Sequence, residues 1–272
     1  MKNQIFSTPS LYIKQWGEQI SKPELSLTSA SRKVVVRFTG GCGSMSKEDA
    51  IGLYDIFVKA FDGFEGAILF GGSRMLKRFD PTEVVPGITE IPPLIKRNCP
   101  KSVILGIIPR FQELKISQHG LVVSDETGND FFTIAHPDQG QCVVVQKSAD
   151  EGVGVIPHLK FGGWEVEYLE CQRIISDLIS YAKFSSLLVS YNGGKVTEAE
   201  IVSTAERGWP VLLINGSGRK SDEYANNRKF LDKYPNVLVA EKDAESIREV
   251  LFATHVLKSE FQVFKSQKAV NE

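Results

Sequence analysis

Four short loops rich in glycine stand out because basic side chains lie in or beside three of them. Glycine lets a backbone approach a phosphate closely, and arginine can donate two parallel hydrogen bonds to a phosphate or carboxylate. The basic residues are Arg74, Lys195 and Arg219. The other residues that we expect to contact a ligand are Gly40, Gly41, Gly43, Gly71, Gly72, Ser73, Gly193, Gly194, Thr197, Gly216, Ser217, Gly218 and Asp222. This pattern predicts a site for a phosphorylated or nucleotide-like ligand.

The loops follow short apolar runs that are typical of buried strands. These runs occupy 34–38, 66–70, 102–108, 142–146, 186–190, 211–215 and 236–240. Continuous apolar runs suit parallel strands that are covered by helices on both faces. Segments with apolar residues at helical spacing lie at 47–61, 166–183 and 196–207. The alternation predicts an α/β fold: a Rossmann-like, doubly wound, mostly parallel sheet with helices on both faces.

Residues 111–140 interrupt this alternation and predict a β-hairpin insertion around Thr127-Gly128-Asn129. We therefore expect three parts of the chain. Residues 1–33 form an N-terminal extension, 34–242 the nucleotide-binding domain, and 243–272 a helical C-terminal tail.

The position of the loops in such a fold decides their meaning. Ligands of open α/β sheets bind outside the carboxyl ends of the strands, where helix N-termini also point their N–H groups. We expect the loops at 40–44, 71–74 and 216–219 each to lead from a strand into a helix, with 192–195 beside them. A single such loop is weak evidence and is more often only a tight turn, but four at one edge favour a ligand.

Several classes of protein are excluded or disfavoured. Residues 41–46 and 216–221 both read GxGxxS, with serine where a dinucleotide-binding motif has Gly or Ala, and the second predicted strand ends without an acidic residue. The phosphate-loop motif GxxxxGK[ST] is absent. A net charge of −1 argues against nucleic acid as a partner.

The same reasoning addresses the membrane, metals and the compartment. No run approaches 18 apolar residues, so we expect no transmembrane segment. The four cysteines form no CxxC pair, and the four histidines lack metal-like spacing. We therefore expect a cytoplasmic protein without a metal or resident cofactor.

The stretch LLVSYNGGKVTEAEIVSTAERGWPVLLINGSGRKSDEYA resembles the end of the N-terminal cytosolic domain of melastatin-type TRP channels (LSDAT-like), a branch of the SLOG superfamily. The matching positions are Gly193, Gly194, Pro210, Gly216, Ser217, Gly218, Arg219 and Asp222. GAILFGGSR, KSVILGIIPR and GGWEVEYLE resemble further segments of that domain, although Arg110 stands where the channels usually have an aromatic residue. The resemblance implies binding of an ADP-ribose-like or cyclic nucleotide derivative, as a sensor in a signalling or defence context.

A second branch of the same superfamily, the Lonely Guy-type phosphoribohydrolases, carries PGGxGTxxE. Residues 192–200, NGGKVTEAE, keep both leading glycines, Thr197 and the final Glu200 but replace Pro by Asn192 and the third Gly by Val196. This resemblance implies an alternative function, cleavage of a nucleotide N-glycosidic bond, in which Glu200 is the catalytic residue and Arg219 or Arg74 holds the phosphate.

Individual residues keep two interpretations each. Glu200 is either catalytic or a solvated acidic residue near a helix N-terminus. Thr197 is either an N-cap or a phosphate contact. Asp222 either orients its loop or accepts from a ribose hydroxyl.

Taken together, these features favour a sensor of a nucleotide-derived small molecule over an enzyme. We expect it to form a homo-oligomer and to act through a separate effector. An interaction module that keeps the fold without a ligand is the third class.

Overall fold

The core of the fold is an eight-stranded sheet with the order β1-β10-β6-β3-β2-β11-β12-β13. The computed structural model describes residues 11–13, 26–41, 46–77, 80–110, 114–117, 120–123, 131–135, 142–146 and 165–258. Every neighbouring pair in this sheet is parallel except β1 (Leu11–Ile13) with β10 (Cys142–Gln146). The remaining strands are β2 (Val34–Gly40), β3 (Ala67–Gly71), β6 (Val103–Arg110), β11 (Ser185–Tyr191), β12 (Val211–Ile214) and β13 (Val237–Ala240). The predicted fold class is confirmed, and each predicted apolar run is a strand.

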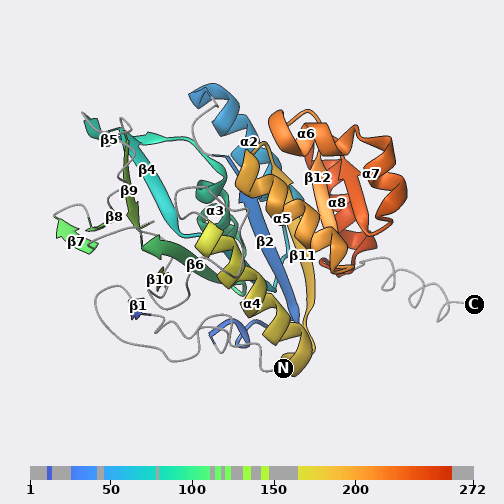
Figure 1. The fold of residues 1–272 in the computed structure, drawn as a ribbon, viewed down its shortest axis with the longest axis horizontal. Coiled ribbons are helices and arrows are strands. Elements are labelled where there is room, and N and C mark those ends of the chain that lie inside the picture. Colours follow the sequence, from blue (N-terminus) through green and yellow to red (C-terminus); the bar gives the residue numbers. More distant parts are fainter. Residues whose placement is uncertain are drawn as a thin grey trace, which may run out of the picture.

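Helices cover both faces of this sheet (Figure 1). One layer contains α2 (Lys47–Ala60), α3 (Ile91–Asn98) and α8 (Ala244–Ala253), and the other contains α4 (Glu165–Ala182), α5 (Lys195–Glu206), α6 (Arg219–Ala225) and α7 (Arg228–Lys233). Alternate side chains of β2 enter the two layers: Val34, Val36 and Phe38 face α2, α3 and α8, whereas Val35 faces α4. Burial on both faces explains why the strands are continuously apolar.

A second, antiparallel sheet has five strands, whereas the sequence predicted only a β-hairpin insertion. It has the order β5-β4-β9-β8-β7 and lies on the opposite side of the molecule from α6, α7 and α8 (Figure 1). Its strands are β4 (Ser73–Lys77), β5 (Asp80–Val85), β7 (Leu114–Ser117), β8 (Gly120–Val123) and β9 (Phe131–Ala135). β7 and β8 form an antiparallel pair within the predicted insertion, while Thr127-Gly128-Asn129 lies outside the described residues.

This sheet corrects one expectation. The loop after β3 leads into β4 at Ser73, not into a helix. A glycine pair after a strand is compatible with either outcome, because it specifies only a sharp change of direction.

Segments outside the expected domain of residues 34–242 also pack against it. β1 from the expected extension pairs with β10 at the sheet edge. In the expected tail, α8 begins with Asp243 accepting a hydrogen bond from the Ser246 N–H, and its Ile247 is fully buried. The division of the chain at residues 34 and 242 therefore stays a prediction. Among the described helices, none is long and apolar enough to cross a membrane.

Candidate functional site

The strand order places a topological switch point between β2 and β11. From β2 the chain moves outward through β3, β6 and β10, and it later adds β11, β12 and β13 on the other side of β2. Because the connections on the two sides turn in opposite directions, the loops after β2 and β11 diverge, and ligands of this fold class bind between them. These loops contain Gly40–Gly41 and Asn192–Gly194, and Gly40 is paired directly with Tyr191.

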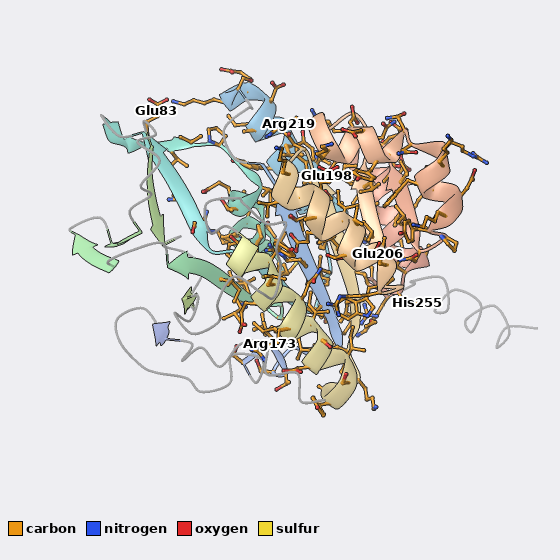
Figure 2. The ribbon with its side chains drawn as sticks, in the orientation of Figure 1. Glu83, Arg173, Glu198, Glu206, Arg219 and His255 are labelled. Carbon is orange, nitrogen blue, oxygen red and sulfur yellow. The ribbon has the colours of Figure 1, made fainter. Side chains whose placement is uncertain are left out.

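The guanidinium of Arg219 lies across the two loops. A Cβ on Gly41 would be 3.1 Å from its Nη1, and a Cβ on Gly194 would be 2.8 Å from its Nη2. Arg219 is exposed and, within the described ranges, forms no ion pair. Figure 2 shows it near the ends of α5 and α6. Gly40, Gly41, Asn192, Gly193, Gly194 and Arg219 together are called the switch-point loops below.

The turn before α5 is held by local hydrogen bonds and an unusual backbone. Asn192 and Gly193 have φ of 59° and 90°, a left-handed region that suits Asn and Gly. The Gly193 N–H donates to the Asn192 side-chain oxygen, and the Asn192 N–H donates to Ser217 Oγ. A Cβ on Gly193 would lie 2.3 Å from Thr197 Oγ1. Close packing against Thr197 therefore requires glycine at position 193. The hydrogen bond to Ser217 joins two of the predicted loops.

The N-cap of α5 is Gly194, which has no side-chain cap, so Thr197 is not the N-cap. The Glu198 N–H donates to the Gly194 carbonyl. The N–H groups of the three residues before it are those that a helix leaves for another acceptor. They give this end of α5 a partial positive charge beside Arg219.

The loop before α6 differs from the start of α5, because its N–H groups are used by hydrogen bonds within the protein. The Lys220 and Ser221 N–H groups donate to the Gly193 and Asn192 carbonyls, so the first turn of α6 binds the neighbouring loop. The carboxylate of Asp222 accepts from the Gly216 N–H and so holds its own loop.

Strain and charge are both present at this loop. Arg219 has φ of 51°, a conformation that is uncommon for a residue other than glycine. Gly216 and Gly218 have φ of 74° and 86°. The Lys242 Nζ lies 5.9 Å from the centre of the Tyr191 ring, and Lys195 is exposed at the start of α5. Basic side chains are therefore present on this side, where Glu198 of α5 is itself paired with Lys220.

The predicted residues around β3 and β4 make their contacts elsewhere. Arg74 donates two hydrogen bonds to Glu90 at 2.9 and 2.6 Å. Gly72 donates to the Ile107 carbonyl, and Ser73 is buried. Gly43 lies outside the described residues. The structure thus brings three of the four predicted loops together and engages the basic residue of the fourth in an ion pair.

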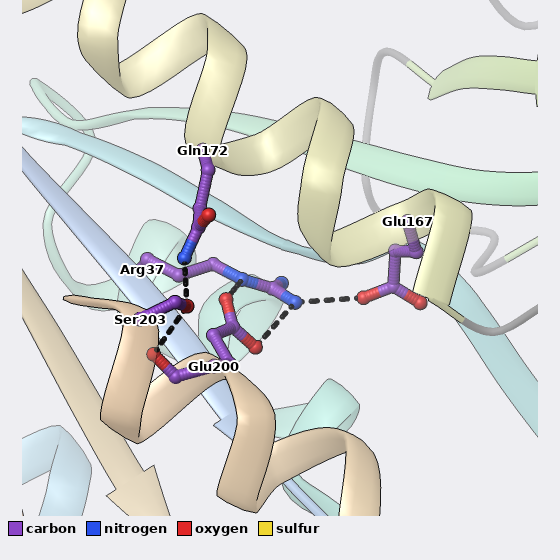
Figure 3. Close-up of polar contacts among 5 residues, drawn as sticks. All are labelled: Arg37, Glu167, Gln172, Glu200 and Ser203. Carbon is purple, nitrogen blue, oxygen red and sulfur yellow. Dashed lines mark hydrogen bonds and ion pairs between the residues drawn. The ribbon is translucent and has the colours of Figure 1, made fainter. Parts of the chain in front are cut away.

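Glu200 is buried rather than solvated, which corrects one of its two interpretations. Its side chain is 1% exposed, and its two oxygens accept from Arg37 Nε at 2.8 Å and Nη2 at 3.3 Å. Arg37 Nη2 also donates to Glu167 Oε1 at 2.8 Å (Figure 3). Arg37, Glu167 and Glu200 are called the buried charge cluster below.

Electrostatics within this cluster follow from burial and charge. Burial opposes the charge on Arg37, but the electrostatic influence of Cys171, Glu200 and Glu167 outweighs it and raises the pKa of the guanidinium well above its ordinary value. Burial raises the pKa of Glu167, although Arg37 counteracts this and Glu200 reinforces it. Two carboxylates thus share one guanidinium, and Glu167 is the carboxylate that binds a proton more readily than usual.

The surroundings of the cluster are a pair of hydrogen bonds between α4 and α5 and a close approach to Gly71. Gln172 of α4 donates to Ser203 Oγ of α5, and Ser203 in turn donates to the Glu200 carbonyl (Figure 3). A Cβ on Gly71 would lie 2.7 Å from Glu167 Oε1. Gly71 therefore makes room for a carboxylate of the protein itself.

Sequence reasoning missed Arg37 and Glu167. Arg37 had a usable signal, because a charged residue inside the apolar run VVVRF must find a buried partner if the strand is covered on both faces. Glu167 had none, since it is one of several acidic residues in EVEYLE.

Comparison with known proteins gives a limited result. No family model matches the chain, and no curated protein matches it. Among solved structures, the protein TM1055 is similar, with 16% identity over 81% of this chain and 99% of its own, at a TM-score of 0.43. The molybdenum cofactor binding protein from Rippkaea orientalis matches with 16% identity over 82% of this chain and 98% of its own, also at 0.43.

The molybdenum cofactor carrier protein from Chlamydomonas reinhardtii matches with 15% identity over the same shares of the two chains and the same TM-score, 0.43. Similarity at this level carries no information about the ligand or the site residues of the present chain.

Proposed function

We propose that the protein binds a phosphorylated, nucleotide-derived small molecule at the switch-point loops. The observation that carries the proposal is the position of Arg219. Its guanidinium is exposed, lies across Gly41 and Gly194 at the switch point, and has no carboxylate partner within the described ranges. A cation held there at the start of α5 is suited to a phosphate oxygen.

The surrounding residues support an anionic group at this position. The N-terminus of α5 and the side chains of Lys195 and Lys242 add positive charge on the same side. Glycine at 41 and 194 leaves the Arg219 guanidinium free of side-chain obstruction from the neighbouring loops. We further propose that the ligand is ADP-ribose-like, as the resemblance to the melastatin-type domain implies.

The geometry favours binding over hydrolysis by Glu200. A general base must reach the water that it activates. The carboxylate of Glu200 is almost fully buried, and Arg37 occupies both of its oxygens. We therefore propose a sensor that signals through a separate effector and self-association, with phosphoribohydrolase activity as the second candidate.

A ligand panel tests this proposal. ADP-ribose, NAD, cyclic ADP-ribose isomers and AMP are incubated with the protein, and melting temperature and released base are measured together. Stabilisation with intact ligand supports the sensor. Release of free base that is abolished in Glu200→Gln supports the hydrolase, and no response to any compound contradicts both.

A pair of glycine variants tests the role of Arg219 without removing its charge. In Gly194→Ala the new methyl group would lie 2.8 Å from Nη2 and displace the guanidinium. We expect the affinity for ADP-ribose to fall roughly tenfold, the effect of losing one charge-assisted hydrogen bond. Gly52→Ala is the control, because nothing lies within 4 Å of the added Cβ.

A further inference from the structure

One donor of the buried charge cluster has no hydrogen-bond partner within the described part of the chain. Among the described residues, Arg37 Nη1 is a buried side-chain nitrogen without a hydrogen bond, although the side chain is only 3% exposed. Buried polar groups are almost always hydrogen-bonded, and leaving one unpaired is costly. Nε and Nη2 of the same guanidinium are already paired with carboxylates. This donor is therefore available to an acceptor that the described side chains do not supply.

The cluster also offers an acceptor. Arg37 uses both oxygens of Glu200 but only Oε1 of Glu167. Oε2 of Glu167 takes no part in this ion pair, and the side chain is 12% exposed. Glu167 lies against Gly71, the last residue of β3, so this carboxylate reaches the same edge of the sheet as the switch-point loops.

The charge of the cluster limits what it accepts. One guanidinium and two carboxylates sum to a formal charge of −1, which repels a second anionic group. A hydroxyl is uncharged and can both accept from Arg37 and donate to Glu167.

We propose that Arg37 and Glu167 form a polar subsite beside the switch-point loops, which takes an uncharged, hydroxyl-bearing part of the ligand such as a sugar ring. Glu200 serves as the buried counter-ion that holds the guanidinium. The inference deepens the proposed function and rests on it: Arg219 holds the phosphate, and this subsite holds the polyol attached to it.

The register of the strands makes the two positions compatible. Gly71 follows Phe70, which pairs with Phe38, so Glu167 lies level with Thr39. Gly41, which lies against Arg219, is two residues beyond Thr39, just past the end of β2, and one strand across from Gly71. These are steps of about 3.3 Å per residue and 4.8 Å per strand. One phosphorylated sugar can bridge that separation.

The test compares methyl phosphate, which carries no hydroxyl group on its carbon, with ribose 5-phosphate. Both are titrated into the full chain and followed by phosphorus NMR. We expect the wild type to bind ribose 5-phosphate about tenfold more tightly than methyl phosphate, the gain from hydrogen bonds to charged groups. Glu167→Gln should remove most of this preference and leave the affinity for methyl phosphate unchanged.

Two further variants separate the subsite from the fold and from the phosphate site. Gly71→Ala keeps all charges but displaces the Glu167 carboxylate, so it should also lower the preference, whereas Gly52→Ala should not. Arg219→Gln should weaken both compounds alike. If the wild type binds both compounds equally, or Glu167→Gln weakens both equally, the subsite is wrong while the phosphate site stands. If methyl phosphate does not bind, or binds Arg219→Gln as tightly as wild type, the proposed function fails and the subsite falls with it.

Discussion

Replacing Arg37 by methionine should destabilise the protein severely, because it leaves two carboxylates facing each other in the interior. Methionine fills much of the same volume, so the loss of the guanidinium is the main change. Breaking a buried ion pair by removing one partner costs about 3–5 kcal/mol. For a domain of this size each kcal/mol lowers the melting temperature by about 2–4 °C, so we expect a fall of roughly 6–20 °C.

A double-mutant cycle attributes this loss to the pairing. Removing the opposing charge in Arg37→Met/Glu200→Gln should recover part of the stability, with a coupling free energy of about 1–3 kcal/mol. Arg228→Met is the matched control, since its ion pair with Asp232 is exposed and should leave the urea midpoint unchanged. Urea unfolding followed by circular dichroism measures each variant. A loss below about 1 kcal/mol for Arg37→Met, or strict additivity with Glu200→Gln, would refute the reasoning.

Three further predictions follow from packing and titration. Gly40→Ala places a Cβ 2.2 Å from the Tyr191 carbonyl oxygen of the adjacent strand, so we expect a loss of about 3 kcal/mol or more in urea unfolding; a midpoint equal to that of wild type would contradict this. The raised pKa of Glu167 contributes stability that is complete below the unfolded-state pKa and declines as pH rises through the folded pKa. The stability of wild type relative to Glu167→Gln should therefore fall from pH 4 to 7, and a rise would be inconsistent with the assigned direction. Burial and the hydrogen bond to Glu198 raise the pKa of Tyr224 to about 12, so the phenolate absorbance lost in Tyr224→Phe should appear near pH 12 and not near pH 10.

The strands of the main sheet could be predicted because burial on both faces leaves a local mark, an uninterrupted apolar run such as 34–38. The order of those strands leaves no such mark. The contact between Gly41, Gly194 and Arg219 depends on β2 pairing with β11, whose paired residues Val34 and Ser185 are far apart in the sequence. The sequence therefore indicated which loops were suited to an anion but not which of them meet.

Local patterns failed where the same residues suit two outcomes. Gly71–Gly72 marks a turn, and the chain enters a strand instead of a helix because Ser73–Lys77 pairs with the distant Phe131–Ala135. Glu200 lies in the second turn of an amphipathic helix. Its pairing with Arg37 becomes visible only when the adjacent strand β2 is placed beside that helix. A charged residue in a covered strand was the one signal in the sequence that pointed to this pair.

The affinity of the protein for ADP-ribose with and without Arg219 tests the central claim most directly. Isothermal titration is carried out on the wild type, Arg219→Gln and the control Arg228→Gln. We predict that the wild type and the control bind ADP-ribose equally well. Arg219→Gln should bind it roughly 10- to 100-fold more weakly, as expected for the loss of a charge-assisted contact. Equal affinity in all three proteins, or no binding to any of them, would contradict the account.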